Sequence, residues 1–359
     1  MKTTQIIKSK DIDPKVVSAA NNYITQSLLM DDKTYWTVKM FISTNLFLWH
    51  LDAFAGKDDP VPLFIEKMNS ATEMLKIVKD SRFSGNHFPI NEIVQMNEDE
   101  FEGHVSNLFS DIWVDMTDDI YFDESFEFTK NRFYVNNIDP HEFFHGKTVL
   151  DAGCGSGKFS CAIARFGAKK VIGLDIGEKG LEFAKKQAKK TEYEKILEYK
   201  HGSLLNIPLS DKSVDIVWSN GVIHHTLNYE KCINEFSRVI KPGGNLFLYV
   251  NGRFGLFELL CDSIRISITD VPRQLQQFHL LTLGVNSGRL YWMLDCMNAP
   301  YEWKSKKEVI SLLKNYGFND VIQLTRGIST DQIEQVSTGL SYAKEKYGEA
   351  QLKFICKKY

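Results

Sequence analysis

The stretch Val149-Leu150-Asp151-Ala152-Gly153-Cys154-Gly155-Ser156-Gly157 decides the fold of this 359-residue chain. It joins a short apolar strand at 148–151 to a helical pattern at 158–166. Glycines between a strand and a helix let the backbone turn tightly and approach a ligand without an intervening side chain. The stretch therefore predicts a ligand-binding turn at the carboxyl end of a buried strand.

Strands and helices alternate after this turn. The predicted strands cover 170–175, 198–200, 214–219, 245–250, 320–324 and 351–356, and the predicted helices cover 178–190, 229–240 and 306–316. Pro242-Gly243-Gly244 is expected to end the helix at 229–240, and Ser305 and Glu308 have the spacing of a capping box. This alternation implies a doubly wound parallel sheet, interrupted by a mostly helical insertion at 253–297.

The region before the sheet is expected to be helical. Apolar residues recur at three- and four-residue spacing over 32–83 and again over 102–132. The uncharged segment 40–51 is too short to span a bilayer, and residues 1–10 lack the apolar centre of a secretory signal. Six cysteines without C-x-x-C spacing fit free thiols, so we expect a soluble, cytoplasmic protein without a membrane span.

The overall charge argues against one class of partner. The formal net charge is -3 and the pI is about 6.3, so a dominant basic surface for nucleic acid is not expected. The segment His141-Glu142-Phe143-Phe144-His145 matches the H-E-x-x-H zinc pattern, but a strand begins at Thr148 and leaves no room for the long helix that pattern needs. We interpret it as a short surface helix and expect no metal site.

Two carboxylates narrow the identity of the ligand. A G-x-G-x-G turn is shared by proteins that bind nicotinamide, flavin and S-adenosylmethionine. Asp175 ends the second strand, at the separation expected of a carboxylate that accepts both ribose hydroxyls. Asp151 precedes the glycines, where an acidic group suits a cofactor with a cationic amino-acid end better than one with a pyrophosphate. Together they favour S-adenosylmethionine over a nicotinamide cofactor.

The motifs taken together resemble those of the class I S-adenosylmethionine-dependent methyltransferases, in the broad subgroup with the ubiquinone-biosynthesis and small-molecule enzymes. The resemblance rests on the stretches at 151–157, 171–175, 213–226 and 239–244. It implies a Rossmann-like α/β sheet of seven strands whose last strand is antiparallel. The expected organisation is a helical accessory region at 1–130, a cofactor-binding core at 131–252, a helical insertion at 253–298 and the rest of the core at 299–359.

The resemblance also implies where the cofactor binds. Asp151 and Gly153 would line its methionine end with Asn220, Asp175 would bind the ribose, and Ser203 and Leu204 would flank the adenine. Ser203 departs from the family, which often has an acidic residue there. The full expected set of cofactor-binding residues is Asp151, Gly153, Cys154, Gly155, Gly157, Asp175, Ile176, Ser203, Leu204 and Asn220.

His224 and His225 are the candidate catalytic residues. They follow the fourth strand at the carboxyl edge of the sheet, where an imidazole can take a proton from an acceptor hydroxyl. The alternative is that one of them only packs or forms hydrogen bonds. Candidate residues for the acceptor, each of which is equally suited to a core, are Tyr121, Tyr134, Arg253, Tyr291 and Tyr301.

The predicted function is methyl transfer from S-adenosylmethionine to a small-molecule acceptor by in-line displacement, leaving S-adenosyl-L-homocysteine. The insertion is expected to act as a lid over the acceptor, and the N-terminal helices offer a surface for a homodimer. Two alternatives stay open: a methyltransferase directed at RNA or protein, and a non-catalytic scaffold that binds S-adenosylmethionine. No nucleic-acid base is expected as acceptor, because Asn298-Ala299-Pro300-Tyr301 lies far from the fourth strand, where an N-P-P-Y motif belongs.

Overall fold

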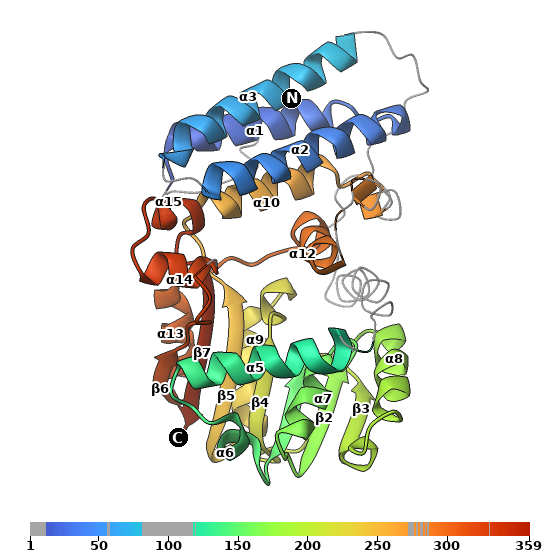
Figure 1. Ribbon diagram of the computed structural model, residues 1–359, viewed down its shortest axis with the longest axis vertical. Coiled ribbons are helices and arrows are strands. Elements are labelled where there is room, and N and C mark those ends of the chain that lie inside the picture. The colour runs from blue at the N-terminus through green and yellow to red at the C-terminus, as the bar shows by residue number, and fades with distance from the viewer. Residues whose placement is uncertain are drawn as a thin grey trace. The chain divides into compact units, whose positions relative to one another are not determined.

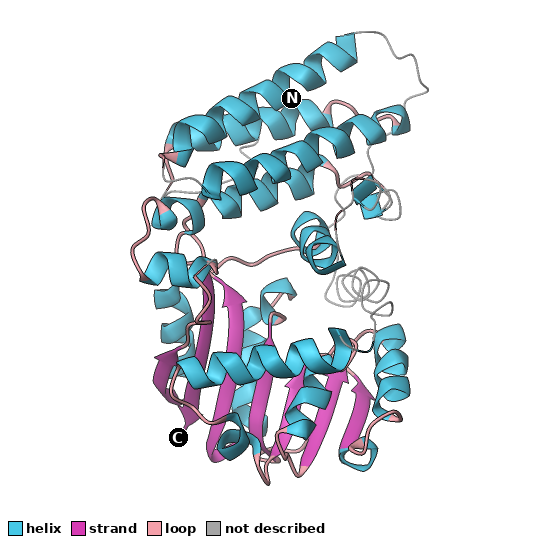
Figure 2. Cartoon of the chain, in the orientation of Figure 1, coloured by secondary structure: helices cyan, strands magenta, loops and turns pink. Residues whose placement is uncertain are grey.

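The computed structural model describes residues 12–55, 58–80, 118, 120–271, 276–277, 279–280, 283, 285, 287–329 and 331–359. The chain forms two compact units. The sheet unit comprises residues 96–252, 300–335 and 351–359, and the helical unit comprises 1–95, 253–299 and 336–350. In the described parts, all strands belong to the sheet unit (Figure 2).

The sheet unit is built on seven strands in the order β3-β2-β1-β4-β5-β7-β6 (Figure 1). Their bounds are β1 Thr148–Ala152, β2 Lys170–Asp175, β3 Leu197–His201, β4 Val214–Asn220, β5 Ile240–Asn251, β6 Phe318–Gln323 and β7 Gln351–Lys358. The first five strands pair in parallel, and β7 is antiparallel to both β5 and β6. The predicted Rossmann-like sheet with an antiparallel last strand is confirmed.

Alternate residues along the strands face two separate apolar cores, because successive side chains of a strand point to opposite faces. Leu150, Val217 and Leu248 face one core, which is completed by α9 and α13. Val149 and Phe247 face the other, below α5, α6 and α7, and Figure 1 shows α5 lying across this face. The helices of the sheet unit are α5 Ser125–Val135, α6 Pro140–Phe144, α7 Lys158–Arg165, α8 Glu178–Ala188, α9 Tyr229–Val239 and α13 Lys306–Asn315.

The segment Pro242-Gly243-Gly244 corrects one expectation. It does not simply end a helix, because α9 ends at Val239 and the triplet lies inside β5, where Val214 pairs with Ile240 and the next pair is Ile216 with Asn245. The extra residues form a bulge. A Cβ atom at Gly244 would lie 2.5 Å from the carbonyl oxygen of Asp215, so the bulge brings two backbones together where a side chain has no space.

The helical unit contains both the N-terminal helices and the helices of the insertion. Its main helices are α1 Pro14–Leu28, α2 Trp36–Ala55, α3 Pro60–Asp80, α10 Leu256–Ser267, α12 Ser287–Asn298 and α15 Ala343–Tyr347. The Ser27 hydroxyl donates to the carbonyl of Ser267 at 2.8 Å, and the ammonium of Lys39 lies 2.7 Å from the Asp270 carboxylate. None of the helices that the structure describes is long and apolar enough to cross a membrane.

Three helical segments differ from the sequence prediction. Helix α1 was not predicted, and neither were α14 Gln332–Ser337 and α15, which separate β6 from β7. Of the helix expected at 102–132, residues 102–117 lie outside the described residues, and the described remainder begins with a π-helical turn, η2 Ile120–Glu124, before α5.

We predict that Ser305→Ala will lower the free energy of unfolding by about 1 kcal/mol, because it removes an N-cap. The Ser305 hydroxyl accepts from the backbone N–H of Glu308 and the Glu308 carboxylate accepts from the backbone N–H of Ser305, as the capping box predicts. Chemical denaturation measures the change. Ser311→Ala, an exposed position in the same helix, is the matched control, and equal stability of the two variants would contradict a role for the cap.

Candidate functional site

The glycine turn after β1 has a backbone that only glycine adopts without strain. Gly153, Gly155 and Gly157 have φ angles of 81°, 52° and 80°, in the left-handed region. A Cβ atom at Gly153 would lie 2.4 Å from Cγ1 of Val222. The turn therefore leads the chain from β1 into α7 with its backbone bare of side chains at three positions.

The carboxylate of Asp175, at the end of β2, holds this turn in place. Its Oδ2 accepts from the backbone N–H of Gly155 at 2.7 Å and its Oδ1 accepts from that of Gly177 at 2.8 Å. Burial raises the pKa of this carboxyl, while the backbone bonds act in the opposite direction. Asp175 thus links the ends of two strands at the carboxyl edge of the sheet.

Asp151 lies at the start of the turn and is almost completely buried, with 3% of its surface exposed. Its Oδ2 accepts a hydrogen bond of 2.6 Å from the hydroxyl of Ser160. Burial is the largest cause that raises the pKa of this carboxyl to about 7; the hydrogen bond from Ser160 acts against the rise, and the charge of nearby Asp175 contributes to it. A cationic ligand group would favour its charged form, which is the property expected of it from sequence.

The far side of the turn is supported by aromatic side chains. Tyr121 is fully buried, and its hydroxyl donates to the carbonyl of Ser156 at 2.7 Å. The hydroxyl of Tyr199 lies 2.7 Å from where a Cβ of Gly157 would be, and the Cys154 thiol is buried as well. The structure therefore places Tyr121, expected to contact the acceptor, beneath the glycine turn.

The residues expected around the adenine and ribose lie beside Asp175. The backbone N–H of Gly202 donates to the carbonyl of Asp175 at 2.9 Å, and a ring nitrogen of His201 lies 3.1 Å from the carbonyl oxygen of Ile176. The Ser203 hydroxyl accepts from the backbone N–H of Leu205 at 2.9 Å. Leu204 is buried in the core below. The residues that follow β2 and those that follow β3 are thus hydrogen-bonded to one another at the carboxyl edge of the sheet.

The two candidate histidines and Tyr301 form one cluster after β4, although they are distant in sequence. The ring of Tyr301 stacks on His224 at 5.1 Å and meets His225 edge-on at 4.5 Å. The Nδ1 atom of His225 lies 2.8 Å from the carbonyl oxygen of Pro300. Both histidines are buried, and burial together with the neighbouring His225 lowers the pKa of His224 well below its usual value.

The other expected acceptor residues are placed elsewhere. Tyr134, on α5, is 48% exposed. Arg253 belongs to the helical unit, where its Nη2 lies 3.8 Å from the Glu258 carboxylate. Tyr291 lies in α12 of the same unit, and its side chain is outside the described residues.

The H-E-x-x-H segment does not form a metal site. Helix α6 holds five residues, and His145 lies beyond its end with an extended ψ of 128°. In the parts of the chain that the structure describes, no group of three or more His, Cys, Asp or Glu side chains is placed to hold a metal ion. The interpretation as a short helix before β1 is confirmed.

Two buried cations, one of them beside Asn220, were missed by the sequence analysis. Arg132, on α5, and Lys353, on β7, are each 1% exposed. Nη1 of Arg132 lies 3.4 Å from Oδ1 of Asn220, the last residue of β4. In sequence, Arg132 lies in an ordinary amphipathic helix and Lys353 in a lysine-rich C-terminal strand, so nothing there marks either as buried.

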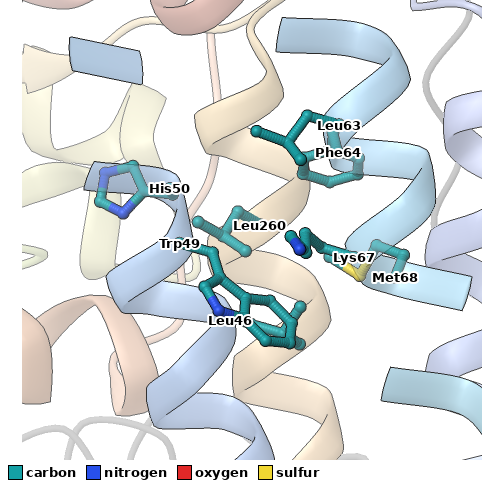
Figure 3. Close-up of a pocket in the computed structure, with 8 residues that line it drawn as sticks. All are labelled: Leu46, Trp49, His50, Leu63, Phe64, Lys67, Met68 and Leu260. Carbon is teal, nitrogen blue, oxygen red and sulfur yellow. The ribbon is translucent and has the colours of Figure 1, made fainter. Parts of the chain in front are cut away.

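A pocket in the helical unit is a weaker candidate. It is lined by residues of α2, α3 and α10, namely Leu46, Trp49, His50, Leu63, Phe64, Lys67, Met68 and Leu260 (Figure 3). The ammonium of Lys67 lies 4.9 Å from the ring centre of Trp49. The lining contains no carboxylate, so it lacks the acidic groups found at and beside the turn at 151–157.

We predict that stability will fall below pH 6.5 because of His224. The unfolded residue takes up a proton near pH 6.5 and the buried residue does not, so the free energy of unfolding falls by about 1.4 kcal/mol per pH unit below that value. His224→Phe should flatten this part of the pH profile of denaturation. Ile223→Val, a buried neighbour, should lower stability equally at every pH, and an unchanged slope in His224→Phe would contradict the assignment.

Comparison with known proteins agrees with this geometry. Residues 150–248 match a family described as a methyltransferase domain. The 27-O-demethylrifamycin SV methyltransferase of Amycolatopsis mediterranei is 32% identical over 103 residues, 29% of this chain and 38% of that protein. The malonyl-[acyl-carrier protein] O-methyltransferase of Yersinia pestis is 38% identical over 114 residues, 32% and 40% of the two chains.

A third relative matches a similar share of the chain. The ubiquinone biosynthesis O-methyltransferase of Agrobacterium fabrum is 29% identical over 124 residues, 34% of this chain and 48% of that protein. The matched segments span less than half the length of each of these three relatives. The family match at 150–248 lies in the sheet unit and includes the glycine turn, Asp175 and Asn220. This part of the chain is therefore similar to a methyltransferase domain.

Proposed function

We propose that this protein transfers a methyl group from S-adenosylmethionine to a small-molecule acceptor. The observation that carries the proposal is the bare glycine turn held by Asp175, with buried Asp151 at its start. S-adenosylmethionine supplies a methyl group on a positively charged sulfur, which an acceptor atom displaces in line. Much of the rate enhancement then comes from orientation and from exclusion of water.

The residues present fit this cofactor. The Asp175 carboxylate has about four acceptor sites, of which the backbone N–H groups of Gly155, Gly177 and Ile176 use three, so it can also accept from a ribose hydroxyl. Asp151, with its pKa raised by burial, suits the ammonium of the methionine end. The bare backbone of Gly153 and Gly155 admits that end at close range, and Ser203 and Leu204 lie where the adenine is expected.

We assign His225 rather than His224 as the base for a hydroxyl acceptor. The carbonyl of Pro300 can only accept, so it keeps the proton on Nδ1 of His225 and leaves Nε2 as the proton-accepting atom of the neutral ring. Burial lowers the pKa of His224 well below its usual value, which weakens His224 as a base. Tyr301, in contact with both rings, would hold them in position.

The relatives support an oxygen acceptor. By their names, those of Yersinia pestis and Agrobacterium fabrum are O-methyltransferases. The roles expected of the helical segments, a lid at 253–298 and a homodimer through the N-terminal helices, stay predictions.

Calorimetric titration with S-adenosylmethionine, S-adenosyl-L-homocysteine and NADH tests the proposed cofactor. We expect micromolar binding of the first two and none of NADH. Failure of both adenosyl compounds to bind would overturn the proposal. Binding without methyl transfer to any of a panel of metabolite hydroxyl compounds would favour the non-catalytic scaffold.

We predict that Asp175→Ala will weaken binding of S-adenosyl-L-homocysteine by about 1–3 kcal/mol, because charge-assisted hydrogen bonds to the ribose are lost. Calorimetry measures the change. Glu182→Ala, at an exposed position on the following helix, is the matched control and should bind as the wild type does. Equal affinity of the two variants would remove the ribose assignment of Asp175.

A further inference from the structure

Three cationic side chains gather on the face of the sheet that α5 covers. They are Arg132 on α5, Lys353 on β7, and Arg326 in the segment after β6. The guanidinium groups of Arg132 and Arg326 lie 4.1 and 4.3 Å from the ring centre of Phe128. All belong to the sheet unit.

Only one of the three has a carboxylate partner among the described residues. Nη1 of Arg326 lies 3.0 Å from Oδ2 of Asp331, and its backbone N–H donates to Glu334. The Lys353 ammonium donates to the neutral side chain of Gln351 at 2.6 Å. The described ion pairs include neither Arg132 nor Lys353.

The guanidinium of Arg132 has poor hydrogen bonding for a buried charge. Its Nη1 is at the long distance of 3.4 Å from Asn220, and its Nε is buried without a partner in the described part of the chain. Contact with the ring of Phe128 compensates only part of the lost hydration. Burying a charge without an opposite charge beside it lowers the stability of the fold. The presence of two such side chains, Arg132 and Lys353, therefore needs an explanation.

The two cations also oppose each other. Burial is the largest cause that lowers the pKa of Arg132 to about 9 and that of Lys353 to about 7, and the charge of Arg132 is the second cause at Lys353. The charges of Asp331 and Glu334 raise the pKa of Lys353, but they do not bring it back to its usual value. An anion between or beside the two would relieve both effects, since an opposite charge favours the charged form.

The pair lies at the edge of the sheet where ligands of this fold bind. Arg132 meets Asn220, the last residue of β4. Lys353 pairs with Tyr249, two residues before β5 ends at Asn251, and its ammonium lies 4.9 Å from the Tyr249 ring centre. The cations thus adjoin Asn220, which is expected beside the methionine moiety, and Tyr249, which lies 6.2 Å from His224 between ring centres.

We propose that Arg132 and Lys353 together bind an anionic group, a carboxylate or a phosphate, of the methyl acceptor. This inference rests on the proposed function. The cofactor's own carboxylate is a poorer match, because the methionine end also carries an ammonium and is neutral as a whole. Arg132 and Lys353 take no part in the ion pair of Arg326, and two such cations suit a separate anion with one or two negative charges.

The first experiment uses inorganic phosphate and succinate as probes of the full-length protein saturated with S-adenosyl-L-homocysteine. We expect calorimetry to show binding of at least one probe, weakened at least tenfold in Arg132→Gln and in Lys353→Met. Lys357→Met, an exposed lysine of the same strand, should bind as the wild type does. Absence of probe binding by the wild type, or equal binding by all three variants, would overturn the inference.

The second experiment separates the two sources of the anion. S-adenosyl-L-homocysteine carries the amino-acid end, and 5′-methylthioadenosine lacks it. We expect both to bind Arg132→Gln and Lys353→Met within about threefold of the wild type. Selective loss of S-adenosyl-L-homocysteine would assign the cations to the cofactor's carboxylate and overturn the inference. Failure of the wild type to bind S-adenosyl-L-homocysteine would instead overturn the proposed function, on which this inference depends.

Folding and pH provide the remaining checks. Lys353→Met removes a buried cation that Arg132 repels, so the thermal midpoint of this variant should not fall. If Arg132→Gln does not fold, the binding measurements on Lys353→Met decide the test. Succinate binding should weaken as pH rises through 7, where Lys353 loses its proton, and the slope should be flatter in Lys353→Met. An equal slope in both proteins would contradict the role of Lys353.

Discussion

The hydrogen bonds from Gly155 and Gly177 to the carboxylate of Asp175 are the interaction on which the site depends. They tie the turn after β1 to the end of β2. The carbonyl of Leu174 adds to this by accepting from the backbone N–H groups of Gly153 and Cys154. The turn is therefore held in its left-handed conformation by the neighbouring strand, and a ligand meets a site that is already formed. Such preorganisation reduces the entropy lost on binding.

Buried charge is the second constraint on the site. Asp151 has a pKa raised to about 7, while those of Arg132 and Lys353 are lowered to about 9 and about 7. All three shifts have burial as their largest cause, so each group is held in an environment that disfavours its charged form. A ligand that brings positive charge to Asp151 and negative charge to Arg132 and Lys353 would favour the charged form of all three groups. This pattern of buried charges matches the charges of the ligands proposed above.

The sequence alone was sufficient to predict the sheet and the glycine turn at the carboxyl end of its first strand. Its strands have strong apolar periodicity, and the turn between β1 and α7 depends on residues that are neighbours in sequence. The same analysis missed α1, in which the buried face combines Val16 and Ile24 with alanines and with Ser27, so small and polar residues hide the helical spacing. The sequence analysis also expected Tyr121 at the acceptor. Sequence can show that an aromatic residue lies near the site, but it cannot show on which side of the turn the ring lies.

Long-range side-chain contacts were the part that sequence could not provide. His224 and Tyr301 were separate candidates, and their stacking depends on how the segment after α12 returns to the sheet. Arg132 and Lys353 lie more than two hundred residues apart and meet only because α5 covers the strand pair β5 and β7. A buried lysine has the same sequence signature as an exposed one, and its environment appears only in the folded chain.

The path of the chain joins several residues of the proposed acceptor side to the helical unit in sequence. Among the described residues, the chain passes between the two units at 252–253, 299–300, 335–336 and 350–351. Tyr301 follows the second of these passages by two residues, and Lys353 follows the last by three. At the first, Gly255 leaves no space for a Cβ atom, which would lie 2.4 Å from the backbone of Tyr347. The glycine turn, in contrast, is distant in sequence from each of these passages. The proposed acceptor side therefore depends on segments that return from the helical unit, whereas the proposed cofactor side is formed within one uninterrupted stretch of the sheet unit.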